Sequence, residues 1–302
     1  MWLILAFCSA CLLGLYDVAK KNSLQGNAVI PVLALNTFFS SLIFLPFIIG
    51  AYLGVSFPAD SPFHLKTISN AEHYYIFVKS LIVLSSWLFG YYAMKHLPLT
   101  IVGPINATRP IMVLIGGILI YAERLNLYQW IGVILAILSF YLMSRSGKKE
   151  GIDFRRNKWI IYLMLAAFLG AVSGLYDKYL ISRCGFSPME VVSWYNLYQF
   201  LEMLLVLILV WYPRRKKFVF HWRWSILWIS LFISAADFAY FYALSYEDSL
   251  ISVVSMIRRS SVLVSFMCGA LLFREKNLRE KFFDLLLVFL SLCFLYFGSD
   301  PS

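Results

Sequence analysis

Ionisable and polar side chains interrupt apolar segments of the chain, and their types could bind a small charged solute. Arginine forks suit carboxylate or phosphate groups, Glu202 or Asp237 could relay a proton, and aromatic rings could hold an apolar body. The candidates for a substrate cavity are Trp87, Tyr91, Asn106, Arg109, Trp194, Tyr195, Gln199, Glu202, Asp237, Tyr240, Ser255, Arg258 and Arg259.

The ionisable side chains among these candidates lie inside apolar segments, where a charge carries a free-energy cost. An ionised group near the centre of a bilayer costs about 2.5–3.5 kcal/mol, and five unpaired ones would cost on the order of 10 kcal/mol, comparable to the whole stability of a domain. The charges must therefore face one another or water. Two interpretations stay open and are compatible: a structural ion pair, such as Arg258 or Arg259 with Glu202 or Asp237, or the lining of a wet cavity.

The segments that carry these residues have the length of membrane spans. Of 302 residues, 61% are hydrophobic and 14% charged, and the apolar runs of about 20 residues match the thickness of a bilayer. We predict an all-α integral membrane protein of the cell membrane. The ten predicted helices are 2–20, 28–54, 74–95, 98–122, 126–144, 158–180, 188–212, 224–246, 249–273 and 277–298.

The chain contains an internal duplication. The step Gly-Leu-Tyr-Asp at 14–17 returns at 174–177, and at the same offset Asn36 meets Asn196. In later segments, equivalent positions of the two copies are 150 residues apart, because the loop after the second helix is longer in the first copy. We predict one repeat over 1–147 and a second over 148–302. Candidates for gate or repeat-motif residues are Tyr16, Asp17, Asn36, Tyr176, Asp177 and Asn196.

An odd number of helices in each repeat has a physical consequence. The second copy must enter the membrane from the opposite side, so the two five-helix repeats are inverted about an axis in the membrane plane. Such a pair is typical of carriers that work by alternating access at a central cavity. A channel would favour an oligomeric pore, whereas an internal inverted pair predicts a monomer or a weak homodimer.

The segment ATRPIMVLIGGILIYAERLNLYQWIGVILAILSFYLM resembles the EamA family. The matching positions are Pro110, Glu123, Arg124, Gln129 and Gly132; the second copy keeps Glu275 but lacks the proline and the Gln-x-x-Gly. The resemblance implies the ten-helix branch of the drug/metabolite transporter superfamily. Members of that superfamily carry amino acids, sugars, phosphorylated metabolites or drugs, so fold does not fix substrate.

Positive charge predicts the orientation. The formal net charge is +10, and clustered Lys and Arg mark loops kept in the cytoplasm, so we predict no nucleic-acid partner. The odd-numbered loops carry most of these residues, above all at 145–158 and 213–223. The positive-inside rule then places both termini outside, whereas the family resemblance implies both termini inside.

The same residues argue against an enzyme. The four histidines do not converge with any of the five cysteines, and no phosphate-binding loop or nucleophile elbow appears. We predict no metal and no cofactor. The favoured function is a secondary transporter of a small anionic or zwitterionic metabolite, an exporter of an amino acid or organic acid in a bacterial inner membrane, with protons as a candidate coupling ion. Sugars, phosphorylated metabolites and cationic drugs remain alternative substrates, and a membrane enzyme remains the rival class.

Overall fold

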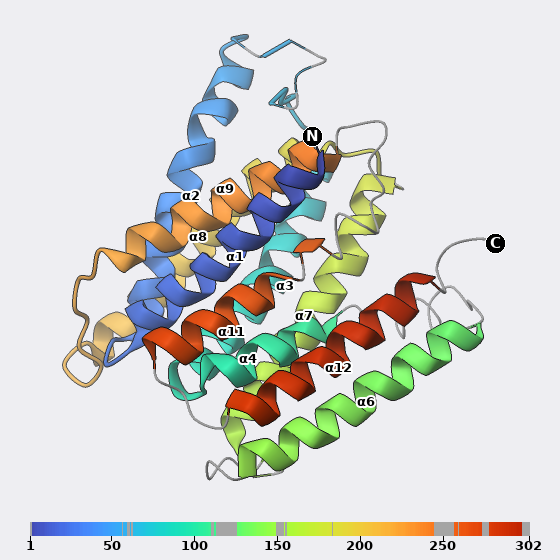
Figure 1. Cartoon of the computed structure of the whole chain (residues 1–302). Helices are drawn as coiled ribbons and strands as arrows, with labels where there is room; N and C mark the ends of the chain where they lie inside the picture. Colours follow the sequence, from blue (N-terminus) through green and yellow to red (C-terminus); the bar gives the residue numbers. More distant parts are fainter. Residues whose placement is uncertain are drawn as a thin grey trace.

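The computed structural model consists of helices throughout its described regular structure (Figure 1). The described residues are 2–55, 57–58, 61, 63–109, 112, 126–148, 154, 156–182, 184–244, 257–258, 260–273 and 278–297. The helices are α1 (Trp2–Leu24), α2 (Val29–Tyr52), α3 (Asn70–His96), α4 (Leu99–Ala107), α6 (Leu127–Lys148), α7 (Lys158–Ser182), α8 (Pro188–Val206) with a π turn (Leu207–Trp211) and a 3₁₀ turn (Tyr212–Arg214), α9 (Ser225–Leu244), α11 (Ser261–Leu272) and α12 (Leu278–Phe297).

The surface of this bundle fits a lipid environment. Five helices of the described part are long and apolar enough to cross a bilayer. The outward faces of these and of the shorter apolar helices leave large apolar side chains uncovered, with Ile4 and Ile137 each 65% exposed and Leu271 74% exposed. A water-soluble chain rarely exposes so much apolar surface. The predicted class, an all-α integral membrane protein, is confirmed.

Equivalent helices of the two copies lie antiparallel, which establishes the inversion. In the pair α2 and α8, Phe38 contacts Phe200 with ring centroids 5.2 Å apart, whereas Tyr52, further along α2, contacts the earlier Trp194 at 6.2 Å. The pair α6 and α12 runs side by side in Figure 1. There Ser291 donates to the Gly132 carbonyl at 2.8 Å and Ser139 to that of Asp284 at 2.7 Å.

Two further pairs cross between the copies and correspond to each other. Helix α1 packs against α9, and α7, the equivalent of α1, packs against α3. Small and hydroxylated residues join both: Ser9 donates to the Ala236 carbonyl at 2.7 Å, and Ser86 to that of Ala166, also at 2.7 Å. Such residues let helices approach closely and hydrogen-bond inside a membrane.

Three of the odd-numbered loops, those after α1, after α3 and before α9, meet at one end of the bundle, which we call the basic end. Asn27, after α1, donates to the His221 carbonyl at 2.7 Å and accepts from the His221 amide at 3.0 Å. Lys95, at the end of α3, donates to the Asn27 carbonyl at 2.7 Å. Lys21 binds the carbonyls of Met94 and Leu97 at 2.7 and 2.5 Å. These bonds tie α1 to α3 and, across the repeat boundary, to the loop before α9.

Two helices expected to be continuous are interrupted near arginines. The sequence predicts helices over 98–122 and 249–273, but Thr108 and Ser260 form turns. Pro104 supplies no backbone N–H inside α4, and Thr108 bonds the Ile105 carbonyl at 2.7 Å with its own hydroxyl. Ser260 bonds the Ile257 carbonyl at 2.6 Å in the same way. The same kind of hydroxyl bond occurs inside uninterrupted helices, as from Ser80 to the Phe77 carbonyl in α3, so it accompanies these turns without explaining them.

Gly14 gives a test of the contact between α1 and α11. A Cβ atom at Gly14 would lie 2.4 Å from the Val264 Cβ, whereas one at Gly90 would meet only the Ala166 Cβ, at an ordinary 3.6 Å. Gly14→Ala is expected to lower the stability by about 1–3 kcal/mol through overpacking. The measurement is the melting temperature in detergent, with Gly90→Ala as the matched control. Equal melting temperatures for the two variants would contradict this packing.

Candidate functional site

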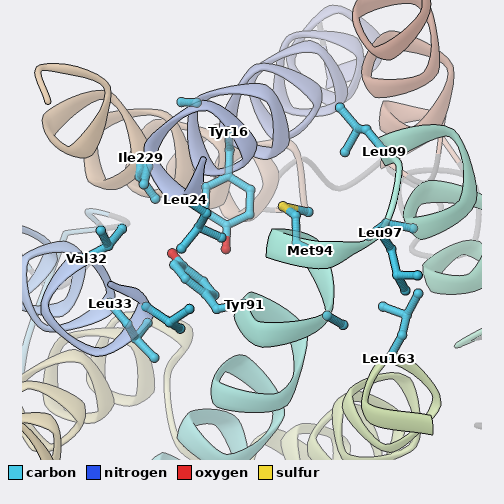
Figure 2. Close-up of a cluster of buried hydrophobic side chains, with 14 of the residues drawn as sticks. Tyr16, Leu24, Val32, Leu33, Tyr91, Met94, Leu97, Leu99, Leu163 and Ile229 are labelled. Atoms are coloured by element: carbon cyan, nitrogen blue, oxygen red, sulfur yellow. The ribbon is translucent and has the colours of Figure 1, made fainter. Parts of the chain in front are cut away.

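A polar cluster formed by α1, α2 and α3 lies inside the larger apolar core. Lys20 pairs with Asp17 at 2.9 Å, and its ammonium lies 4.2 Å from the Tyr16 ring centroid and 5.2 Å from that of Tyr91. Asn36 donates to the Tyr91 hydroxyl at 3.0 Å. Figure 2 shows the side chains of Tyr16 and Tyr91 pointing toward each other, among buried leucines. Tyr91 and Asn36 are almost completely buried. We call Tyr16, Asp17, Lys20, Asn36 and Tyr91 the first cluster.

Arg109 extends the first cluster toward the second repeat. Its guanidinium donates to the Asn106 side chain at 3.1 Å and interacts electrostatically with Asp17. It lies on the backbone of α7 at Gly170, where a Cβ atom would approach the guanidinium carbon to 2.8 Å. The Arg109 Nε is buried and has no hydrogen-bond partner in the described part of the chain.

A second cluster joins α3 to α7. Lys79 forms an ion pair with Asp177 and donates to the Ser173 hydroxyl at 2.7 Å. Its ammonium also lies 5.9 Å from the Tyr195 ring centroid on α8. Because the lysine side chain is only 5% exposed, it depends on this carboxylate for its neutralisation.

A second ion pair lies next to it. Arg258 pairs with Asp237 on α9, one of the pairings that the sequence analysis left open, and its guanidinium lies 4.3 Å from the Tyr240 ring centroid. Asp237 interacts electrostatically with both Asp177 and Tyr195. We call Lys79, Asp177, Tyr195, Asp237, Arg258 and Tyr240 the second cluster.

Several buried polar atoms in the described helices lack hydrogen-bond partners. Gln199 on α8 is fully buried with both amide atoms unpaired. Glu202, one turn further on, accepts from Ser80 through Oε1, while its Oε2 is unpaired. On α2, the Asn36 Oδ1 and the Ser40 hydroxyl also have no partner among the described residues. Buried polar groups are normally satisfied, so these atoms are candidates for binding water or a polar solute.

The remaining sequence candidates lie elsewhere or outside the described residues. Trp87 packs against the apolar core, and Trp194 contacts His73, with ring centroids 4.5 Å apart, near the start of α8. Tyr176 donates to the Tyr75 carbonyl at 3.2 Å, and the Asn196 amide donates to a carbonyl of its own helix. Ser255 and Arg259 lie outside the described residues.

Lys79 was not among the candidates predicted from the sequence, yet it forms an ion pair between the repeats. A signal was present: the lysine interrupts the apolar run YYIFVKSLIVL, well inside the predicted span 74–95. Lys20, three residues after the candidate Asp17 on the same helix, pairs with its carboxylate.

Among the described candidate charges, two are left without an ion pair. Asp17, Asp177 and Asp237 each have a basic partner, whereas Arg109 and Glu202 form none with any described residue. The two lie at similar depth. Helices α3 and α7 run antiparallel, with Lys79 bonded to Ser173 and Ser86 bonded to Ala166. In this register Gly170, which contacts the Arg109 guanidinium, lies level with residue 82 of α3. Ser80, which binds Glu202, is two residues away, about 3 Å along the axis.

Comparisons with known proteins agree with this architecture. A model described as the EamA-like transporter family matches residues 1–145 and 157–297. A solved structure described as "Crystal structure of protein" aligns with a TM-score of 0.59 at 14% identity, covering 96% of this chain and 94% of the other. At this identity the likeness concerns the fold alone. A search of curated proteins finds no match.

The Lys79–Asp177 pair gives a second test. Lys79→Met or Asp177→Asn alone is expected to lower the stability by about 3 kcal/mol, the lower end for a broken buried pair, because the Asp177 side chain is 39% exposed. The double variant is expected to recover most of this loss, since no charge is left unpaired. Melting temperatures in detergent report the effect, with Lys66→Met in the exposed loop after α2 as the control. Additive losses in the double variant would show that the two charges do not depend on each other.

Proposed function

The chain belongs to the EamA-like transporter family, and from this premise we propose that it carries a small zwitterionic or anionic metabolite, such as an amino acid or an organic acid. The proposed mechanism is alternating access, in which the two inverted repeats rock about the clusters between them. As a multi-pass membrane protein of a transporter family, it is proposed to act as an exporter in a bacterial inner membrane.

The observation that carries this proposal is that two charges, those of Arg109 and Glu202, form no ion pair with any described residue. The Arg109 fork suits a carboxylate, and the Glu202 carboxylate suits an ammonium group. Their similar depth places a positive and a negative group on one level of the bundle, as the two ends of an amino acid require. Gln199 and Asn36 add unpaired amide atoms for further hydrogen bonds.

The two clusters are proposed to act as the two gates. Asp17 and Asp177 occupy equivalent positions of inverted copies, so they belong to opposite sides of the central region. The first cluster then closes the side toward the basic end, and the second closes the other side. Opening one side requires its helices to separate, which for the second cluster means breaking the Lys79–Asp177 pair.

Proton coupling is proposed to involve Glu202 rather than Asp237. Asp237 is already neutralised by Arg258, whereas Glu202 has an unpaired carboxylate oxygen and could bind either a proton or the ammonium group of the substrate. Competition between the two at a single carboxylate would couple export to proton entry.

Removing the Arg109 charge tests the substrate site. Arg109→Ala is expected to abolish flux of the preferred amino acid or organic acid in proteoliposomes, because the charge-assisted hydrogen bonds to the carboxylate are lost. The substrate is first chosen by a thermal-shift screen of amino acids, organic acids, nucleotides and sugar phosphates. Arg259→Ala, at the equivalent position of the second repeat, is expected to behave alike.

Gly170→Ala provides a matched probe that keeps the Arg109 charge. The added methyl group displaces the guanidinium without removing it, so the apparent substrate affinity should fall by about tenfold while the protein still folds. Gly90→Ala, elsewhere between α3 and α7, is the control. Unchanged flux in both Arg109→Ala and Gly170→Ala would overturn the assignment of Arg109.

The proton proposal predicts a difference between two carboxylate variants. Wild-type flux should increase when an inward proton gradient is imposed on the liposomes. Glu202→Gln should lose this response, because the amide cannot exchange a proton. Asp237→Asn should retain it at a lower flux, because it leaves Arg258 unpaired. Flux measured over a series of imposed gradients distinguishes them, and a response that survives in Glu202→Gln would exclude Glu202 as the proton site.

A further inference from the structure

An elongated groove runs along the outside of α1, next to the start of α9 and the end of α11. Its volume is about 640 Å³. On α1 it extends from Leu15 to Gln25, about 15 Å at 1.5 Å per residue. Leu15, Val18 and Phe232 form its apolar part, and Asn22 and Gln25 lie at its polar end. The wall formed by α1 therefore changes from apolar to polar along its length, as a lipid does, while Leu272 and Phe273 line the opposite wall.

This groove belongs to the lipid-facing surface rather than to the central clusters. Leu15, Trp228 and Leu272 on its walls are 37%, 51% and 65% exposed, whereas Ala19 on its floor is 7% exposed. The side chains of the first cluster lie behind that floor, on the buried face of α1. An occupant would enter sideways from the bilayer, because the walls are open in that direction.

The polar end of the groove lies at the basic end of the bundle. Arg223 donates to the Asn22 carbonyl at 2.6 Å, so its guanidinium is held beside the groove. The rest of the loop, at 214–217, adds four exposed basic residues, and the loop has no acidic residue between 213 and 224. Trp222 and Trp224 are 47% and 72% exposed, and such tryptophans mark the membrane–water interface. The basic charge therefore lies at the depth of lipid headgroups.

We propose that this groove is a binding site for one anionic phospholipid. An acyl chain lies along Leu15, Val18 and Phe232, and the headgroup phosphate lies between Arg223 and the amide side chains of Asn22 and Gln25. The excess of positive charge selects an anionic headgroup over a zwitterionic one. The site is separate from the transported solute, so it stands or falls independently of the proposed function.

The test is a lipid titration of the purified full-length protein in detergent, with bound lipid counted by native mass spectrometry. Phosphatidylglycerol and phosphatidylcholine with identical oleoyl chains are compared. We expect one phosphatidylglycerol to bind more tightly than any phosphatidylcholine. Arg223→Gln should weaken phosphatidylglycerol binding about fivefold, the effect of one basic residue near a membrane surface, and leave phosphatidylcholine unchanged. Lys66→Gln, a basic residue of the loop after α2, is the matched control.

Filling the groove tests its apolar part. Leu15→Trp should abolish the tight binding of phosphatidylglycerol, whereas Leu42→Trp, on the exposed face of α2, should not; Val18→Phe serves where Leu15→Trp does not fold. Brominated phosphatidylglycerol should also quench tryptophan fluorescence in a saturable phase that Trp228→Phe removes. Equal affinity for the two lipids, or tight binding that survives both Arg223→Gln and a filled groove, would overturn the proposal.

Discussion

The cost of placing charge inside a membrane governs this structure. A lysine or aspartate within a spanning helix is tolerated only when another group neutralises it or water reaches it. Lys79 and Asp177 satisfy this requirement by pairing between α3 and α7, and Arg258 and Asp237 by pairing beside α9. The Lys79–Asp177 pair links the two repeats. The contact that neutralises the two buried charges therefore also fixes how the repeats lie against each other.

The inverted copies share a helix arrangement but use their charges differently. Asp17 pairs with Lys20 on its own helix, whereas Asp177, its equivalent, pairs with Lys79 on a helix of the other repeat. The positions equivalent to the two lysines hold Leu180 and Ile229. The two ends of the central region are therefore held by unequal contacts, so in the proposed alternating-access mechanism opening one side has a different free energy from opening the other. A duplicated carrier acquires a preferred resting state in this way.

The sequence was sufficient for the architecture because the signals involved are long and regular. Spans of about 20 apolar residues and the returning Gly-Leu-Tyr-Asp step determine the helices and the inversion. Pairings of single side chains were harder to predict. Lys79 looked like one residue in an apolar run, and its partner lies almost a hundred positions away. The turns at Thr108 and Ser260 interrupt apolar runs that look continuous, so no periodic pattern reveals them.

The two interrupted helices connect the fold to the proposed transport. Breaks in spanning helices occur where a protein lines a cavity or binds a solute. Here both breaks adjoin arginines: Arg109 directly follows one turn, and Arg258 lies two residues before the other. Arg109 also lies on the bare backbone of Gly170 in the second repeat. A carboxylate drawn to this guanidinium would thus pull on a broken helix of one repeat and on α7 of the other, so that binding the solute and moving the repeats become a single event.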